Sequence, residues 1–110
     1  MVEFHVSEYV TAQGNCPFRQ WSLGLDDSVN GRVHNRIRRL AQGNFGQHRH
    51  LGNGLCEAKL DFGPGYRVYF GVQGRQLLVL LVGGDKRTQD RDILRAKQYW
   101  EDFLEAYGER

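Results

Sequence analysis

The spacing of apolar residues predicts both strands and helices in the first half of the chain, because side chains repeat every two residues in a strand and about every 3.6 in a helix. Alternation of apolar and polar residues predicts a short strand that begins near Val2 and ends near Val10. Helical spacing then predicts a short helix from Pro17, a residue suited to the first helical position, and a longer helix capped by Asp26 or Asp27. Residues 42–53 are glycine-rich and polar, so we expect a loop there.

Three strands and a final helix are predicted in the second half. Alternation predicts strands over residues 55–62 and 66–72, and the turn Gly63-Pro64-Gly65 between them makes the pair antiparallel. The unbroken apolar run over residues 77–82 is typical of a central strand covered on both faces. Thr88 can cap a last helix. The apolar face of that helix comprises Ile93, Ala96, Trp100, Phe103 and Tyr107.

The resulting order, β-α-α-β-β-β-α, predicts an α+β protein with a small, mainly antiparallel sheet packed with helices. The chain has 110 residues, of which 40% are hydrophobic, enough for one modest core. No repeat or linker interrupts it. We therefore expect a single domain over residues 1–110.

Charge is distributed unevenly along the sequence, although the formal net charge is only +2. Residues 31–50 contain five arginines and three histidines but no acidic residue, whereas the tail after Trp100 is acidic. This polarity predicts a basic face.

The sequence predicts neither a metal site nor a disulfide framework. Cys16 and Cys56 lie in unrelated contexts, and His48 and His50 have no cysteine or carboxylate partner nearby in sequence. We expect no cofactor. The start lacks the pattern of a leader peptide, and no stretch approaches the roughly 20 apolar residues of a membrane span, so we expect a cytoplasmic protein with no membrane contact.

Three cations are predicted to lie together and are our catalytic candidates. Arg67 lies on the strand face opposite the apolar one, and Lys59 occupies the same side of the adjacent strand. Lys86 follows Gly83-Gly84 at the end of the central strand, where glycines allow close approach of a ligand. Such cations can stabilise the charge of a phosphodiester during cleavage without a metal. Alternatively, Lys59 pairs with Glu57 or Asp61 on a solvated face.

Further candidates could bind RNA or the ribosome. Arg32, Arg36 and Arg39 form a ridge at helical spacing, which suits either a nucleic-acid backbone or a solvated helix face. Tyr69, beside Arg67, could stack on a base, and Arg87 could add a cation. Tyr66 is expected in the core.

Four segments carry a family resemblance: Leu-Ala-Gln-Gly-Asn-Phe-Gly at 40–46, Gly-Leu-Cys-Glu-Ala-Lys-Leu at 54–60, Gly-Pro-Gly-Tyr-Arg-Val-Tyr at 63–69, and Gly-Gly-Asp-Lys-Arg-Thr-Gln at 83–89. Asp92, Ile93 and Ala96 follow. Together they resemble the addiction-module killer proteins, a branch of the RelE/ParE/HigB toxin superfamily. The predicted element order is also that of the RelE-like fold.

The resemblance implies the toxin of a type II toxin-antitoxin pair. It implies a cognate antitoxin, often of the helix-turn-helix type and encoded adjacently, with operator DNA bound only through the complex. Many relatives cut mRNA on the ribosome without a metal, through attack by the RNA's own 2′-hydroxyl. By this resemblance, Arg67 corresponds to a phosphate-stabilising arginine, Lys59 lies on the strand that supplies basic residues, and Lys86 or Arg87 occupies the place of a further cation.

The chain departs from the RelE pattern in one respect. RelE-type enzymes often carry a tyrosine or histidine acid near the C-terminal end, and the final helix here, with Tyr99 and Tyr107, offers no secure counterpart. ParE-like relatives share the fold but poison DNA gyrase, and fold alone does not separate the two activities. The hypotheses are therefore a ribosome-dependent mRNA endoribonuclease, favoured by the cations, a gyrase inhibitor, or a non-enzymatic nucleic-acid-binding protein that works only with its partner.

Overall fold

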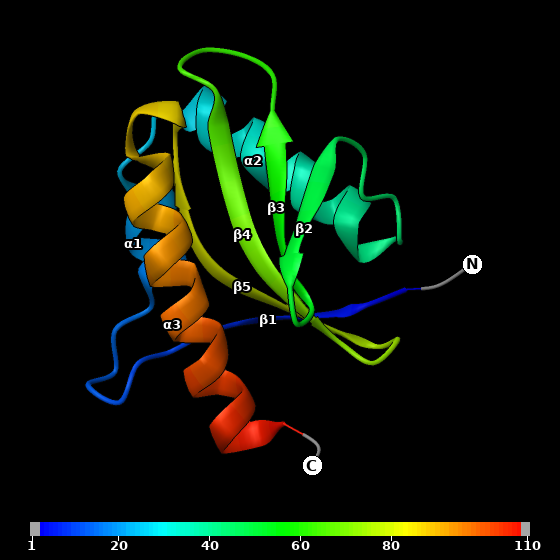
Figure 1. Cartoon of the computed structure of the whole chain (residues 1–110). Helices are drawn as coiled ribbons and strands as arrows, with labels where there is room; N and C mark the ends of the chain where they lie inside the picture. The colour runs from blue at the N-terminus through cyan, green and yellow to red at the C-terminus, as the bar shows by residue number, and fades with distance from the viewer. Residues whose placement is uncertain (1–2, 109–110) are drawn as a thin grey trace.

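The computed structural model describes residues 3–108, which form one sheet and the helices packed on it (Figure 1). The elements in chain order are β1 (His5–Glu8), α1 (Pro17–Leu23), α2 (Asp27–Ala41), β2 (His48–Gly52), β3 (Leu55–Leu60), β4 (Tyr66–Gln73), β5 (Leu77–Gly84), the 3-10 turn η1 (Lys86–Thr88) and α3 (Gln89–Tyr107). None of these helices is both long enough and apolar enough to cross a membrane.

The sheet has five strands in the order β1-β5-β4-β3-β2. The strands from β2 to β5 pair antiparallel with their neighbours, and β1 pairs parallel with β5. The predicted α+β class and mainly antiparallel sheet are therefore confirmed, with one parallel pair that makes the sheet mixed.

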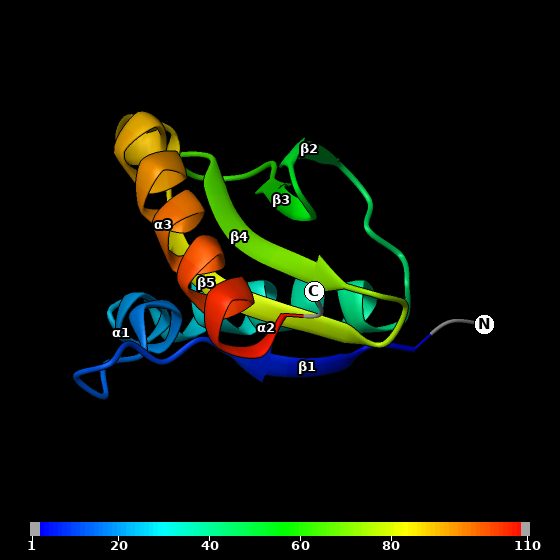
Figure 2. The same ribbon diagram turned by 60° about the horizontal axis from the view of Figure 1, so that its bottom comes forward.

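Helices cover both faces of the central strands. On one face, α1 and α2 contribute Phe18, Val33 and Leu40 to a core that includes Val68 and Phe70 of β4. The opposite face is covered by α3. Figures 1 and 2 show α3 crossing this side of the sheet while α2 lies behind it. The burial of β5 on both faces follows from the apolar run over residues 77–82, as expected.

The second core forms beneath α3. Ala96, Trp100 and Phe103 are buried there against the sheet, together with Tyr69 and Leu81. Tyr107, predicted to continue this apolar face, is instead 74% exposed, because it lies at the last residue of the helix.

The prediction of a loop over residues 42–53 is wrong for its second half, where β2 pairs with β3. Strand β2 is an edge strand whose side chains are largely polar and exposed, so its sequence lacks the apolar alternation of a half-buried strand. Asn53 and the glycines on either side of it adopt positive φ, which forms the tight turn into β3. The observed order therefore contains one strand more than predicted.

The helix starts were predicted closely, whereas the first strand is shorter than expected. Helix α1 begins at Pro17 and α2 begins at Asp27. Strand β1 covers only His5–Glu8, and Val2 lies outside the described residues. Thr88 is the N-cap of α3, as predicted, but its hydroxyl donates to the Asp92 carboxylate and accepts the Asp85 backbone N–H instead of accepting a backbone N–H of α3.

Two glycines provide a matched test of this packing. A Cβ atom at Gly71 would overlap the Trp100 indole. One at Gly31, an exposed position in the first half of α2, would meet no atom of residues 3–108 within 4 Å apart from its chain neighbours and the nearby backbone of its own helix. We expect Gly71→Ala to lower the free energy of unfolding by about 1–3 kcal/mol through overpacking. Gly31→Ala should raise it by about 0.5–1 kcal/mol by favouring the helix. Urea unfolding measures both, and equal effects would contradict the packing of Trp100 on β4.

Candidate functional site

Lys59, Arg67 and Lys86 converge at one end of the sheet, although they come from three segments. Lys59 of β3 is the register partner of Arg67 of β4, so their side chains share one face. The backbone N–H of Lys86 lies 3.3 Å from the Pro64 carbonyl oxygen, which joins η1 to the β3–β4 turn. The position of a Cβ on Gly65 is 3.0 Å from Arg67 Nη1 and 3.6 Å from Lys86 Cβ. The three residues predicted from the sequence are therefore neighbours at this end of the sheet.

Arg67 itself is not the exposed cation that the alternation predicted. Its side chain is only 7% exposed, and Nη1 donates a hydrogen bond to the Gly65 carbonyl. The Nε atom lies 3.9 Å from Glu57 Oε2 and has no hydrogen-bond partner in the described part of the chain. Arg67 is buried because α3, η1 and the glycine turn cover the face that the sequence suggested was open. Its guanidinium therefore stabilises the Gly63-Pro64-Gly65 turn by the hydrogen bond to the Gly65 carbonyl.

Glu57 is a central residue of this site that sequence reasoning assigned only as a possible partner of Lys59. Its buried carboxylate accepts hydrogen bonds from Arg49 Nε at 2.8 Å, the Tyr69 hydroxyl at 2.8 Å and Gln89 Nε2 at 3.0 Å. These donors come from β2, β4 and α3. The carboxylate therefore connects the edge strand, the central sheet and the last helix.

The hydrogen bonds decide the ionisation of this carboxylate. Burial alone would raise the pKa of Glu57, but the hydrogen bonds from Arg49, Gln89 and Tyr69, with the charge of Arg49, lower that pKa below its ordinary value. Burial and the bond to Glu57 raise the pKa of the Tyr69 phenol. Glu57 is therefore an anion and Tyr69 a neutral donor at neutral pH.

The prediction that Tyr69 is available to stack on a base is wrong. Its ring is 0% exposed and lies in the core beneath α3. The strand alternation correctly separated Tyr69 from Tyr66, but both faces of β4 are covered. Tyr66 is half-buried against the other core.

The exposed cations differ in their partners. Arg87 pairs with Asp85, whose Oδ2 lies 3.0 Å from Arg87 Nη2, and this side-chain hydrogen bond is the main reason that the pKa of Asp85 is lowered. Neither Lys59 nor Lys86 forms an ion pair within residues 3–108. Lys86 is exposed and Lys59 is half-buried, so these two ammonium groups are the available charges of the cluster.

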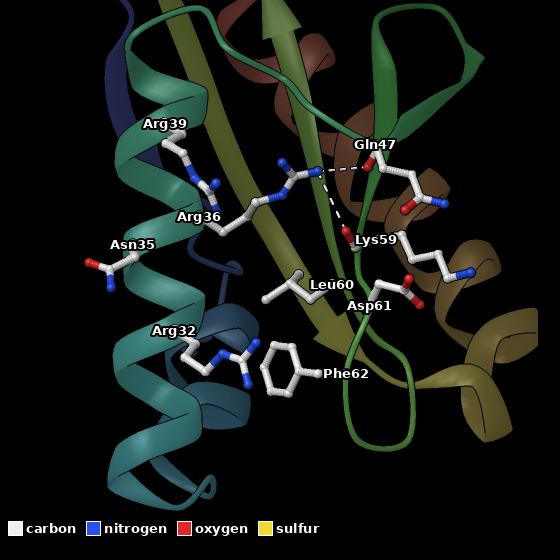
Figure 3. A pocket seen from close by; sticks show the side chains of 9 residues that line it. All are labelled: Arg32, Asn35, Arg36, Arg39, Gln47, Lys59, Leu60, Asp61 and Phe62. Carbon is white, nitrogen blue, oxygen red and sulfur yellow. Dashed lines mark hydrogen bonds between the residues drawn. The ribbon is translucent and has the colours of Figure 1, made fainter.

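Three of the four arginines of α2, Arg32, Arg36 and Arg39, line a cavity of about 330 Å³ between that helix and β3 (Figure 3). The Arg32 guanidinium carbon lies 3.5 Å from the centroid of the Phe62 ring. Arg36 is buried and donates to the Gln47 carbonyl at 2.6 Å, so it is not part of an exposed ridge. Arg39 remains exposed. The three arginines therefore form one basic side of the cavity, in which Arg36 is buried and Arg32 and Arg39 are exposed.

Within the part of the chain that the structure describes, no three His, Cys, Asp or Glu side chains gather as a potential metal site. His48 and His50 lie on β2, where His50 Nδ1 is 3.3 Å from Cys56 Sγ. Burial raises the pKa of that thiol to about 11, so Cys56 is a neutral thiol. Asp92 is buried and bonded to Thr88.

The geometry defines a small α+β protein with Lys59, Arg67 and Lys86 at one end of its sheet and the buried Glu57 carboxylate beside Arg67. No protein-family model matches the sequence. The chain is 48% identical over 81 residues to an uncharacterized protein of Haemophilus influenzae, a match that covers 73% of this chain and 82% of the other. The chain therefore belongs to the same family as that protein. This relationship assigns no activity.

The Glu57 network predicts a defined pH dependence of stability. Because the pKa of Glu57 is lowered on folding, its contribution is fully present above the ordinary value of 4.5 and is lost as the pH falls through the lower folded value. We expect Glu57→Gln to lower the free energy of unfolding by about 1–3 kcal/mol at pH 7. The difference from wild type should shrink as the pH falls below 4.5.

Urea unfolding at pH 7 and in steps below pH 4.5 measures this effect. Glu105→Gln, at an exposed position of α3, is the matched control and should change stability by less than about 0.5 kcal/mol. A Glu57→Gln deficit that stays constant with pH would show that the buried carboxylate contributes no titrating charge.

Proposed function

We propose that this protein is the toxin of a type II toxin-antitoxin pair, with a RelE-like fold, and that it cleaves mRNA on the ribosome in the cytoplasm. The observation that carries the proposal is the convergence of Lys59, Arg67 and Lys86 at one end of the sheet. Three cations from separate segments suit a phosphodiester, and two of them, Lys59 and Lys86, form no ion pair with any of the residues that the structure describes. The resemblance of the surrounding segments to the addiction-module killer proteins supports the same activity.

The proposed reaction is an internal phosphoryl transfer. The 2′-oxygen of the RNA attacks the adjacent phosphorus, and the bond between phosphorus and the 5′-oxygen breaks. The 2′-hydroxyl loses one proton and the leaving 5′-oxygen gains one. The products are a 2′,3′-cyclic phosphate and a 5′-hydroxyl, so the step consumes no water and no cofactor.

The burial of Arg67 divides the roles of the cations. Lys59 and Lys86 are the groups that contact the phosphate, and Arg67 stabilises its charge from behind the Gly65 turn. Preorganised charges of this kind are effective because they need no rearrangement as negative charge develops. Glu57 is a positioning residue, since it holds the Arg49 and Tyr69 side chains and lies beside Arg67.

The partners follow from the same proposal. Messenger RNA and the ribosome are the targets, and a cognate antitoxin, of the helix-turn-helix type and encoded next to this chain, blocks them. Operator DNA is bound only through the toxin-antitoxin complex. This part of the proposal is supported by the sequence resemblance alone.

A second candidate is a gyrase inhibitor without nuclease activity, as in the ParE-like branch. The burial of Arg67 and Tyr69 favours it, because one expected catalytic residue and one expected RNA-binding residue are bound to internal partners. Inhibition of gyrase would block DNA supercoiling and leave messages intact. The two candidates therefore differ in a readout that one induction experiment supplies.

Brief expression without an antitoxin, followed by sequencing of RNA 5′ ends, tests the nuclease. We expect new 5′ ends within translated messages. Lys86→Ala should reduce their number on the order of 100-fold, because an exposed charge that stabilises the transition state is lost. Arg75→Ala is the matched control, since Arg75 is an exposed cation between β4 and β5 at the far end of the sheet. That variant should cleave like wild type.

Circular dichroism should show both variants folded. Cleavage by Lys86→Ala at the wild-type level would show that Lys86 does not act in the reaction. Growth arrest with intact messages and relaxed plasmid DNA would contradict the nuclease and support the gyrase inhibitor.

A further inference from the structure

The cavity between α2 and β3 is lined by guanidinium groups, two of which are fixed by contacts with other residues of the protein. Arg32 packs on the Phe62 ring, and Arg36 reaches from α2 across the cavity toward β3, where its Nη2 donates to the carbonyls of Gln47 and Lys59 (Figure 3). Side chains fixed in this way lose little further entropy when they bind a ligand.

Arg36 provides the evidence that the cavity is built for an anion. The residue is only 7% exposed, and its buried Nε has no hydrogen-bond partner among the residues that the structure describes. Gly46 packs so closely on Nη1 that a Cβ atom there would overlap it. Burial, and secondarily the charge of Arg39, lower the pKa of Arg36, which means that its positive charge is incompletely compensated. Protein atoms cover Nε itself, so an oxyanion in the cavity would compensate the charge of the guanidinium as a whole.

The acidic side chain of the lining does not neutralise these arginines. Asp61 forms no ion pair within residues 3–108, and Figure 3 shows its carboxylate extending away from α2. Guanidinium groups bind phosphate oxygens through paired N–H donors, so phosphate suits this wall.

The position of Lys59 indicates a polymer of phosphates. Its residue lines the cavity, while its side chain points away from α2, toward the face of the sheet where Arg67 lies. Register pairing of β2 with β3 ends at Ala58, and one further backbone hydrogen bond, from the Lys59 N–H to the Gln47 carbonyl, closes this side of β3. Within residues 3–108, β3 therefore becomes the edge of the sheet just beyond Lys59. A single strand of RNA can pass around this edge and place one phosphate at each cationic site.

We propose that the cavity bounded by Arg32, Arg36 and Arg39 is a phosphate-binding subsite that holds the RNA strand one or more nucleotides from the cleaved bond. The identity of the ligand as RNA rests on the function proposed above. The subsite fixes the strand, while Lys59 and Lys86 contact the phosphate that reacts.

Adjacent arginines of α2 offer a matched test. Arg38 and Arg39 are both exposed and carry the same charge, but only Arg39 lines the cavity. The probe is a fluorescent 12-nucleotide 2′-O-methyl RNA, which cannot be cleaved, and the readout is anisotropy against salt concentration. Arg39→Gln and Arg32→Gln should each weaken binding about fivefold to tenfold and lower the salt slope by about 0.7. Arg38→Gln should weaken it less than twofold.

Competitors distinguish the sources of the anion. Unlabelled RNA should displace the probe at far lower concentration than inorganic phosphate, and a hexaglutamate peptide should not displace it. Equal effects of Arg38→Gln and Arg39→Gln, no binding by wild type, or displacement by hexaglutamate as effective as by RNA would each overturn the subsite.

The binding test and the cleavage test can each give a negative result without the other, so they distinguish the subsite from the nuclease activity. Cellular cleavage together with equal binding by Arg38→Gln and Arg39→Gln would overturn the subsite alone. Binding that is sensitive to Arg39→Gln but without cleavage in cells would overturn the nuclease and retain a phosphate subsite for single-stranded nucleic acid.

Discussion

The buried carboxylate of Glu57 is the interaction on which the arrangement of this end of the molecule depends. It binds donors from β2, β4 and α3, and it lies 3.9 Å from the Arg67 guanidinium. Burying a charge is costly unless hydrogen bonds and opposite charge compensate it, and three donors do so here. Because the donors belong to separate elements, the same bonds that satisfy the carboxylate also fix the relative positions of those elements.

This constraint links the fold to the proposed chemistry. Arg67 is held inside by Gly65 and Glu57, so the half-buried Lys59 and the exposed Lys86 are the candidate cations that remain accessible at this end of the sheet. Arg87 is also exposed, but its charge is offset by Asp85. The arginine wall of α2 lies across the β3 edge from them. A phosphate polymer that follows this edge would meet fixed positive charge on both sides, with little rearrangement of the protein.

Much of the fold could be predicted from local patterns, because Pro17, Asp27 and the apolar run of β5 act through their immediate neighbours. Strand β2 was missed because an exposed edge strand carries no apolar alternation. The same run in β5 implied that both faces of the sheet are covered, and the burial of Arg67 and Tyr69 follows from that. The role of Glu57 depends on Gln89, which is 32 residues away, and so on tertiary contacts that sequence spacing does not encode.

The most direct test of the central claim is a reconstituted translation reaction with purified protein and a defined message, in which the RNA ends are identified chemically. The account predicts cleavage only when ribosomes are present, with a 2′,3′-cyclic phosphate on one product and a 5′-hydroxyl on the other, and loss of that cleavage in Lys86→Ala. Messages that stay intact on ribosomes, while the same protein blocks supercoiling by gyrase, would contradict it.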